Sequence, residues 1–188
     1  MSNQLQGKRI AILATDGFEQ AELTEPRKIL EQAGAQIEIL SIKEDEIRGW
    51  DKTDWGDTVK VDRLVSQANP ADYDALVLPG GQINPDKLRM DDSAVNFVRN
   101  FANSGKTVAA ICHGPWTLIE AGVVRGKTLT CWPSVHTDLI NAGARWIDEQ
   151  VVTDGNFITS RKPDDIPAFS QAIIEALSAS RQRLRKAG

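Results

Sequence analysis

The stretch TVAAICHGPW, residues 107–116, decides the fold of this chain. Its first five residues are small, apolar or β-branched, which is typical of a buried strand. The strand pattern ends abruptly at Cys112, and a short apolar helical pattern begins near Trp116. A strand that turns sharply into a helix holds the corner residue exposed and strained, which is the geometry of a nucleophile elbow. The stretch therefore predicts that Cys112 stands at such an elbow.

Cys112 has two interpretations. At the first turn of a helix, the positive end of the helix dipole and unpaired backbone N–H groups stabilise a thiolate, which predicts a reactive cysteine. The alternative is a structural cysteine on a core strand, because free cysteine is often buried. The corner position and the adjacent His113 favour the reactive interpretation.

Strand and helix patterns alternate on both sides of this stretch. A strand over 8–14, a helix over 20–33 closed by Gly34, and a strand over 36–42 form a βαβ unit, which predicts parallel strands. A strand over 73–78, a helix over 93–103 and a final helix over 166–177 continue the alternation. Residues 43–70 predict a small hairpin or flap, and Asp154–Gly155 predicts a hairpin turn. We expect an α/β fold, a doubly wound sandwich with a mostly parallel central sheet and helices on both faces.

Composition limits the classes of partner and compartment. The length of 188 residues predicts a single domain spanning 1–188. A net charge of -4 argues against a nucleic-acid or anionic membrane surface, and the basic residues 181–186 are interpreted as a solvated helix end. Two cysteines cannot form a disulfide framework, and the polar N-terminal residues give no signal-peptide core, so a cytoplasmic location is expected. No apolar run reaches membrane-spanning length.

Backbone donors are predicted beside Cys112. Gly80 and Gly81 follow the strand over 73–78, and the carboxyl ends of strands in open α/β sheets bind ligands. If the strand ends are neighbours, the N–H groups of His113 and of Gly80 or Gly81 could hold an oxyanion. The pair could also be a tight turn only, and both interpretations can hold together.

Four further side chains are candidates for proton transfer. His113 could act as a general base or raise the local positive potential, or it could simply pack over the sheet. Glu19 and Glu22 begin the first helix and could tune the pKa of Cys112, although acids are common at helix starts. Asp86 could reach His113 within one chain or from a neighbouring one, or could be a solvated loop acid.

Together these motifs resemble the PfpI-type intracellular protease and protein deglycase family, in the class I glutamine amidotransferase-like superfamily. The resemblance rests on five segments in the order of the family: FEQAEL (18–23), LPGG (78–81), AICHGP (110–115), NAG (141–143), and residues 151–163 with Ser160–Arg161. It implies a flavodoxin-like sandwich without a cofactor or metal.

The resemblance also implies roles for individual residues. Cys112 would be the nucleophile, Glu22 the acid bonded to its sulfur with Glu19 beside it, and His113 would pair with Asp86 of a neighbouring subunit. A homo-oligomer, a dimer or larger, is therefore expected. Asp86 stands where some relatives have Glu, and residues 82–84 form a longer segment than in close relatives.

Two classes of function follow. The first is a cysteine-dependent stress-response hydrolase acting on glyoxal-type protein adducts, in a deglycase or glyoxalase manner, or on peptides. The second is a redox-sensing stress protein or chaperone in which Cys112 is oxidised to sulfenic or sulfinic acid. Flavin binding ranks last, because the sequence has no phosphate-cradling loop.

Overall fold

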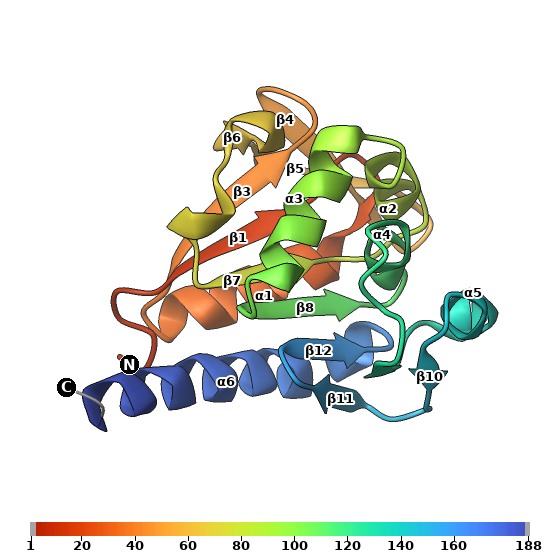
Figure 1. The fold of residues 1–188 in the computed structure, drawn as a ribbon. Helices are drawn as coiled ribbons and strands as arrows, with labels where there is room; N and C mark the ends of the chain where they lie inside the picture. The colour runs from red at the N-terminus through yellow and green to blue at the C-terminus, as the bar shows by residue number, and fades with distance from the viewer. Residues whose placement is uncertain (1–2, 187–188) are drawn as a thin grey trace.

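A computed structural model describes residues 3–186, with side chains described as far as Ala179. Within these residues a seven-stranded sheet forms the centre of the molecule (Figure 1). Every neighbouring pair of its strands is parallel except β11 and β12. In spatial order the strands are β11 (Val151–Asp154), β12 (Phe157–Ser160), β8 (Thr107–Ile111), β7 (Ala75–Leu78), β1 (Arg9–Leu13), β3 (Gln36–Ser41) and β6 (Arg63–Leu64).

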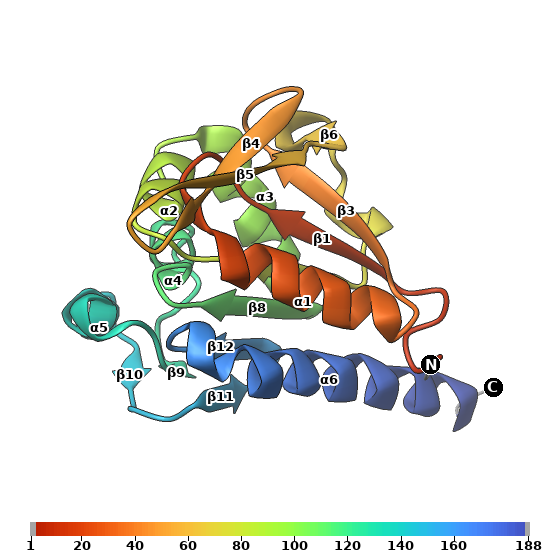
Figure 2. The same ribbon diagram turned by 180° about the vertical axis from the view of Figure 1, so that it is seen from behind.

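Helices cover both faces of this sheet. In the described part of the chain they are α1 (Gln20–Gln32), α2 (Ile83–Leu88), α3 (Asp92–Asn103), α4 (Pro115–Glu120), α5 (His136–Asn141) and α6 (Ile166–Lys186). Helices α1 and α6 lie side by side on one face, and α3 and α4 lie on the other (Figures 1 and 2). None of the helices within residues 3–186 combines the length and apolar character needed to cross a bilayer.

The alternation of side chains along β1 builds the two halves of the core. Ile10 and Ile12 pack among apolar residues of α1 and α6, whereas Ala11 and Leu13 pack with the phenylalanines of α3. All four are fully buried. A strand buried on both faces reads as a continuous apolar run, which is why the sequence around Ile12 shows no alternation.

The order of the strands fixes where a ligand site forms. From β1 the chain moves to β3 on one side, and the later strands β7, β8 and β12 follow on the other side. This is the flavodoxin-like doubly wound arrangement predicted from the sequence. The reversal of strand order between β1 and β7 leaves a crevice at their carboxyl ends, where sheets of this kind bind ligands.

Two smaller sheets complete the fold. The predicted flap is the hairpin of β4 (Glu46–Asp51) and β5 (Asp54–Lys60), and β4 also pairs with β2 (Phe18–Glu19). The second small sheet is the parallel pair of β9 (Thr128–Leu129) and β10 (Arg145–Trp146).

Helix α6 is longer than the expected 166–177, because its helical backbone continues through the polar residues that follow Leu177. The side chains of the basic residues 181–186 lie outside the described part of the chain, and so does their expected role as a solvated helix end.

Candidate active site

Cys112 stands at the sharp corner between β8 and α4. Its φ of 62° lies in the left-handed region, which costs a residue other than glycine about 1–3 kcal/mol. Its N–H donates to the Ser160 carbonyl at 3.1 Å, and its carbonyl accepts from the Trp132 N–H at 2.9 Å. The backbone geometry is therefore that of the predicted elbow, held from both sides.

Gly80 and Gly81 bring the end of β7 against this corner. A Cβ atom on Gly80 would lie 2.6 Å from Glu22 Oε2 and 2.7 Å from Cys112 Cβ, so a side chain has no room there. Gly81 has a φ of +80°, a conformation that suits glycine. Close approach at Gly80 and a positive φ at Gly81 thus explain why both positions are glycine.

The two glycine N–H groups point to different partners. The Gly80 N–H donates to Glu22 Oε2 at 2.8 Å. The N–H groups of Gly81 and His113 face the Cys112 sulfur and act to lower the pKa of that thiol. Of the alternatives left open by the sequence, Gly81 is therefore the glycine with a donor directed at the sulfur, and Gly80 holds the carboxyl.

Glu22 is a fully buried acid beside the sulfur. Burial raises its pKa to about 8, against the opposing effect of the Gly80 N–H and the hydrogen bond with Cys112. At neutral pH the carboxyl is therefore mostly protonated, and a neutral carboxyl can donate its O–H to the sulfur.

The expected lowering of the pKa of Cys112 by the helix is wrong in direction. Burial is the main cause that raises the pKa of the thiol, followed by the charge of Glu22 when that group is ionised. The residue is 6% exposed, and the helix that follows it has six residues. Protonation of Glu22 removes the repulsion, so the state of Glu22 governs how readily Cys112 ionises.

His113 is buried between two tryptophan rings. Its Nδ1 lies 3.2 Å from Cys112 Sγ, and its Nε2 lies 3.4 Å from Ser134 Oγ. Trp132 stacks on the ring with centroids 6.0 Å apart, and Trp116 meets it edge-on at 5.0 Å. Burial lowers the pKa of His113 to about 4, so the imidazole is neutral at pH 7. It does not supply the positive potential considered from the sequence, but it can accept a proton.

Glu19 lines the cavity beside Cys112, whereas Asp86 is not among the lining residues. Glu19 is the residue before α1 and is half-buried; burial and the charge of Asp51 raise its pKa. Asp86 is exposed on α2. Within the described part of this one chain the ring of His113 contacts Cys112 and Ser134, and Asp86 is not among its hydrogen-bond partners.

Asn84 has a role that sequence reasoning missed. The side chain is fully buried. Its Oδ1 accepts from the Thr15 N–H at 2.7 Å, and its Nδ2 donates to the Pro79 carbonyl at 2.9 Å and the Gly80 carbonyl at 3.1 Å. Asn84 thus ties the chain after β1 to the chain after β7. An asparagine directly before Pro85–Asp86 is typical of a turn, so the local pattern carried little signal of this role.

A cavity of about 420 Å³ opens beside the sulfur. The β4–β5 hairpin contributes Trp50 and Lys52 to the lining of this cavity. The lining residues are Gly17, Glu19, Trp50, Lys52, Gly81, Gln82, Ile83, Cys112, His113 and Trp132. Among residues 3–186, no group of three or more His, Cys, Asp or Glu side chains is placed to hold a metal ion.

This geometry provides the groups for nucleophilic attack. The sulfur of Cys112 lines the cavity, two N–H groups converge near it, and a proton donor and a proton acceptor flank it. Such a set can attack an electrophilic carbon and hold negative charge on the oxygen attached to that carbon.

Known proteins are similar to this chain in sequence and in fold. The model of the DJ-1/PfpI family matches residues 8–176. A deglycase of Pyrococcus abyssi is 41% identical over 169 residues, which cover 90% of this chain and 99% of the relative. Protein/nucleic acid deglycase 2 of Escherichia coli is 43% identical over 173 residues, which cover 92% of this chain and 99% of that protein.

A solved structure from Anabaena variabilis extends the comparison to the fold. It contains a DJ-1/ThiJ/PfpI-like domain and a ferritin-like domain, and it superposes with a TM-score of 0.86 at 38% identity over 90% of this chain. The present chain spans 48% of that two-domain protein.

Proposed function

The chain belongs to the DJ-1/PfpI family, and on that premise we propose that it is a cysteine-dependent hydrolase that removes glyoxal-type adducts from protein amines. The observation that carries the proposal is the surroundings of Cys112 Sγ. Glu22 forms a hydrogen bond with the sulfur, and His113 Nδ1 lies 3.2 Å from it. The N–H groups of Gly81 and His113 also face the sulfur.

The pKa values of His113 and Glu22 give the two residues different roles. At neutral pH the imidazole of His113 is neutral and can accept the thiol proton at Nδ1 as Sγ attacks. Glu22 keeps its proton and donates a hydrogen bond to the sulfur. The C–S bond forms at the adduct carbon that carries the amine and a hydroxyl, the C–N bond breaks, and His113 gives its proton to the departing amine. The Gly81 and His113 N–H groups hold the oxygen on that carbon. Water then hydrolyses the C–S bond of the hemithioacetal left on Cys112, which releases the hydrated dicarbonyl and restores the thiol.

The cavity favours a small adduct over an extended polypeptide. Its volume of about 420 Å³ fits a small molecule or one modified side chain, and Trp50 of β4 is among its lining residues. Peptide hydrolysis, the other activity implied by the family resemblance, would need a groove along several residues. We therefore place the adduct first and the peptide second.

Substrate turnover by three forms of the protein tests this proposal. Wild type, Cys112→Ser and Cys131→Ser would be assayed on a methylglyoxal-modified amine and on an unstructured polypeptide. Cys131 is the matched control because it is also a buried free cysteine and is not among the residues that line the cavity. We expect turnover of the adduct by wild type and Cys131→Ser and its loss in Cys112→Ser. Equal activity in all three would end the proposal.

A homo-oligomer that completes the site is proposed with it. Asp86 is exposed on α2, and the contact of His113 Nε2 with Ser134 is long at 3.4 Å. A second copy could therefore bring its Asp86 to that nitrogen.

Mixing two inactive variants tests whether Asp86 acts in trans. A Cys112→Ser chain keeps Asp86, and an Asp86→Ala chain keeps the sulfur, so a hybrid assembly contains one complete site. Recovery of activity on mixing supports action in trans, and no recovery despite subunit exchange contradicts it.

A redox role is the second candidate, and the same surroundings favour it. A protonated Glu22 and the Gly81 and His113 N–H groups could each donate to an oxygen on an oxidised sulfur. Mass spectrometry after mild peroxide would compare Cys112 with Cys131. Faster oxidation at Cys112 supports this role, and equally slow oxidation of both contradicts it.

A further inference from the structure

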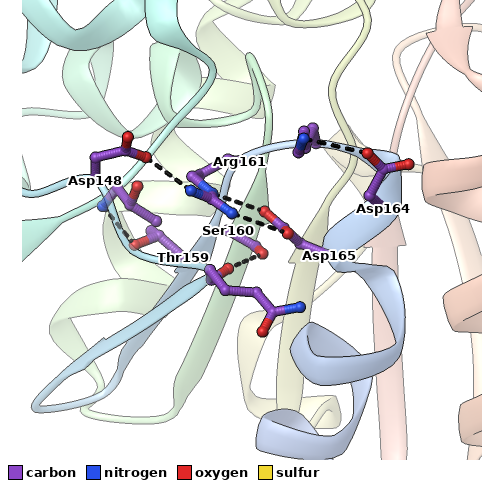
Figure 3. Close-up of polar contacts among 9 residues, drawn as sticks. Asp148, Thr159, Ser160, Arg161, Asp164 and Asp165 are labelled. Atoms are coloured by element: carbon purple, nitrogen blue, oxygen red, sulfur yellow. Dashed lines mark hydrogen bonds and ion pairs between the residues drawn. The ribbon is translucent and has the colours of Figure 1, made fainter.

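Arg161 follows the last residue of β12 and holds two carboxylates. Its guanidinium donates to Asp165 through Nε at 2.9 Å and through a terminal nitrogen at 3.2 Å. The other terminal nitrogen donates to Asp148 at 2.8 Å. Figure 3 shows the guanidinium lying between these two carboxylates.

This arrangement fixes the end of β12 between two parts of the chain. Asp148 precedes β11, whereas Asp165 is 2% exposed and immediately precedes α6. A planar guanidinium that meets a carboxylate with two bonds sets orientation as well as distance, which an ammonium group cannot do. The end of β12 is therefore anchored on both sides.

The anchored strand end carries one backbone partner of the elbow and contacts the segment that supplies the other. The Ser160 carbonyl accepts the Cys112 N–H at 3.1 Å. The Thr159 hydroxyl accepts the Thr130 N–H at 2.9 Å, and Trp132, two residues later, donates to the Cys112 carbonyl at 2.9 Å. The end of β12 thus supplies the carbonyl that accepts the Cys112 N–H. Through Thr159 it also holds the segment from which Trp132 donates to the Cys112 carbonyl.

The left-handed φ of Cys112 makes this support necessary. A strained backbone conformation persists where the surrounding structure over-determines it. If the end of β12 shifted, the corner could relax, and the sulfur would leave the N–H groups of Gly81 and His113.

We propose that Arg161 is a positioning residue for the Cys112 nucleophile, acting through the carbonyl of Ser160. Arg161 is not among the residues that line the cavity, so the proposal assigns it no contact with substrate. It concerns the nucleophile of the proposed function and rests on that function.

The test compares Arg161→Lys with Arg63→Lys. Arg63 pairs with Glu38 at the opposite edge of the sheet, so its variant controls for the loss of an arginine–carboxylate pair. Two quantities are measured: the split between kcat and KM on a methylglyoxal-modified amine, and the pH profile of Cys112 alkylation by iodoacetamide. The second readout needs no enzymatic activity, so it remains valid if the proposed function fails.

In Arg161→Lys we expect kcat to fall at least about tenfold with KM within about twofold, because a small misplacement of a reacting group is costly. We also expect the pH profile of Cys112 alkylation to shift from that of wild type, because the sulfur leaves its fixed place beside Glu22 and the N–H groups of Gly81 and His113. Arg63→Lys should match wild type in both measurements.

A structural role alone would give a different result. Wild-type kcat and alkylation profile in Arg161→Lys, with a lower urea midpoint, would overturn the proposal. If that variant does not fold, Asp148→Asn removes the more exposed partner and leaves the contacts with Asp165. It should move the alkylation profile in the same direction by a smaller amount, and an unchanged profile there would also overturn the proposal.

Discussion

Replacing Glu22 by glutamine should remove a loss of stability that wild type undergoes as pH rises. Burial raises the pKa of Glu22 from the ordinary 4.5 to about 8. Between these two values the unfolded chain has lost the proton and the folded chain keeps it, so the free energy of unfolding falls with rising pH. One pKa unit corresponds to about 1.4 kcal/mol, so the loss across this interval is about 5 kcal/mol.

The Glu22→Gln side chain has no proton to lose, and its amide oxygen can still accept from the Gly80 N–H. The stability difference between variant and wild type should therefore shift toward the variant by about 1.4 kcal/mol per pH unit between pH 4.5 and 8. Urea unfolding at pH 5, 6, 7 and 8, with the thiols kept reduced, measures this slope. Glu25→Gln, at an exposed position on the same helix, controls for the loss of a carboxyl group from α1.

Activity should move in the opposite direction to stability. In Glu22→Gln a weaker N–H donor replaces the carboxyl O–H that donates to the sulfur in the proposed mechanism, so we expect kcat to fall about 100-fold or more. A stability difference that stays constant within about 1 kcal/mol from pH 5 to 8 would refute the reasoning, because Glu22 would then be ionised in the folded protein at neutral pH.

Three further changes probe the same site. Gly80→Ala would place a methyl group 2.6 Å from Glu22 Oε2, so we expect a loss of about 2 kcal/mol and of turnover; a wild-type urea midpoint would contradict this. Asn84→Ala leaves a buried N–H and two carbonyls without a side-chain partner and should cost about 2–3 kcal/mol in urea unfolding, with partial recovery in Asn84→Asp, which keeps the acceptor. Burial lowers the pKa of His113 from 6.5 to about 4, so the unfolded chain binds the extra proton in this interval and stability should fall by about 3 kcal/mol as pH drops through it. His113→Gln should flatten that part of the pH profile, and an unchanged slope would count against a buried neutral imidazole.

Short patterns in the sequence were enough to predict the main strands and helices and the class of fold. The apolar run before Cys112 predicted β8 and its sharp end, and Asp154–Gly155 predicted the β11–β12 hairpin, because these features depend on a few adjacent residues. Gly34 marked the end of α1, where a positive φ of 100° is required. The neighbouring positions of β7 and β8 were only a condition in the prediction from the sequence, and the parallel pairing of Leu78 with Ala110 meets that condition.

The pKa values and hydrogen-bond partners of the site could not be predicted from the sequence, because they depend on contacts between segments far apart in the chain. The raised pKa of Glu22 depends on burial by segments far apart in the chain, and the same burial reverses the expected shift of Cys112. The Gly80 N–H is taken by a carboxyl 58 positions away, so spacing could not distinguish it from the Gly81 N–H. The contacts of Asn84 likewise join two strand ends that are adjacent in space and distant in sequence.

The left-handed backbone at residue 112 narrows the range of nucleophiles that evolution or a protein engineer could install on this scaffold. At a φ of 62°, β-branched side chains are genuine outliers, so threonine is excluded although its hydroxyl is a nucleophile in other hydrolases. Serine fits the backbone, but its hydroxyl is a weaker acid than a thiol and would face a buried imidazole whose lowered pKa makes it a weak base. An exchange of chemistry here would thus require a rebuilt corner or a retuned pair of partners, and neither is a single-residue step.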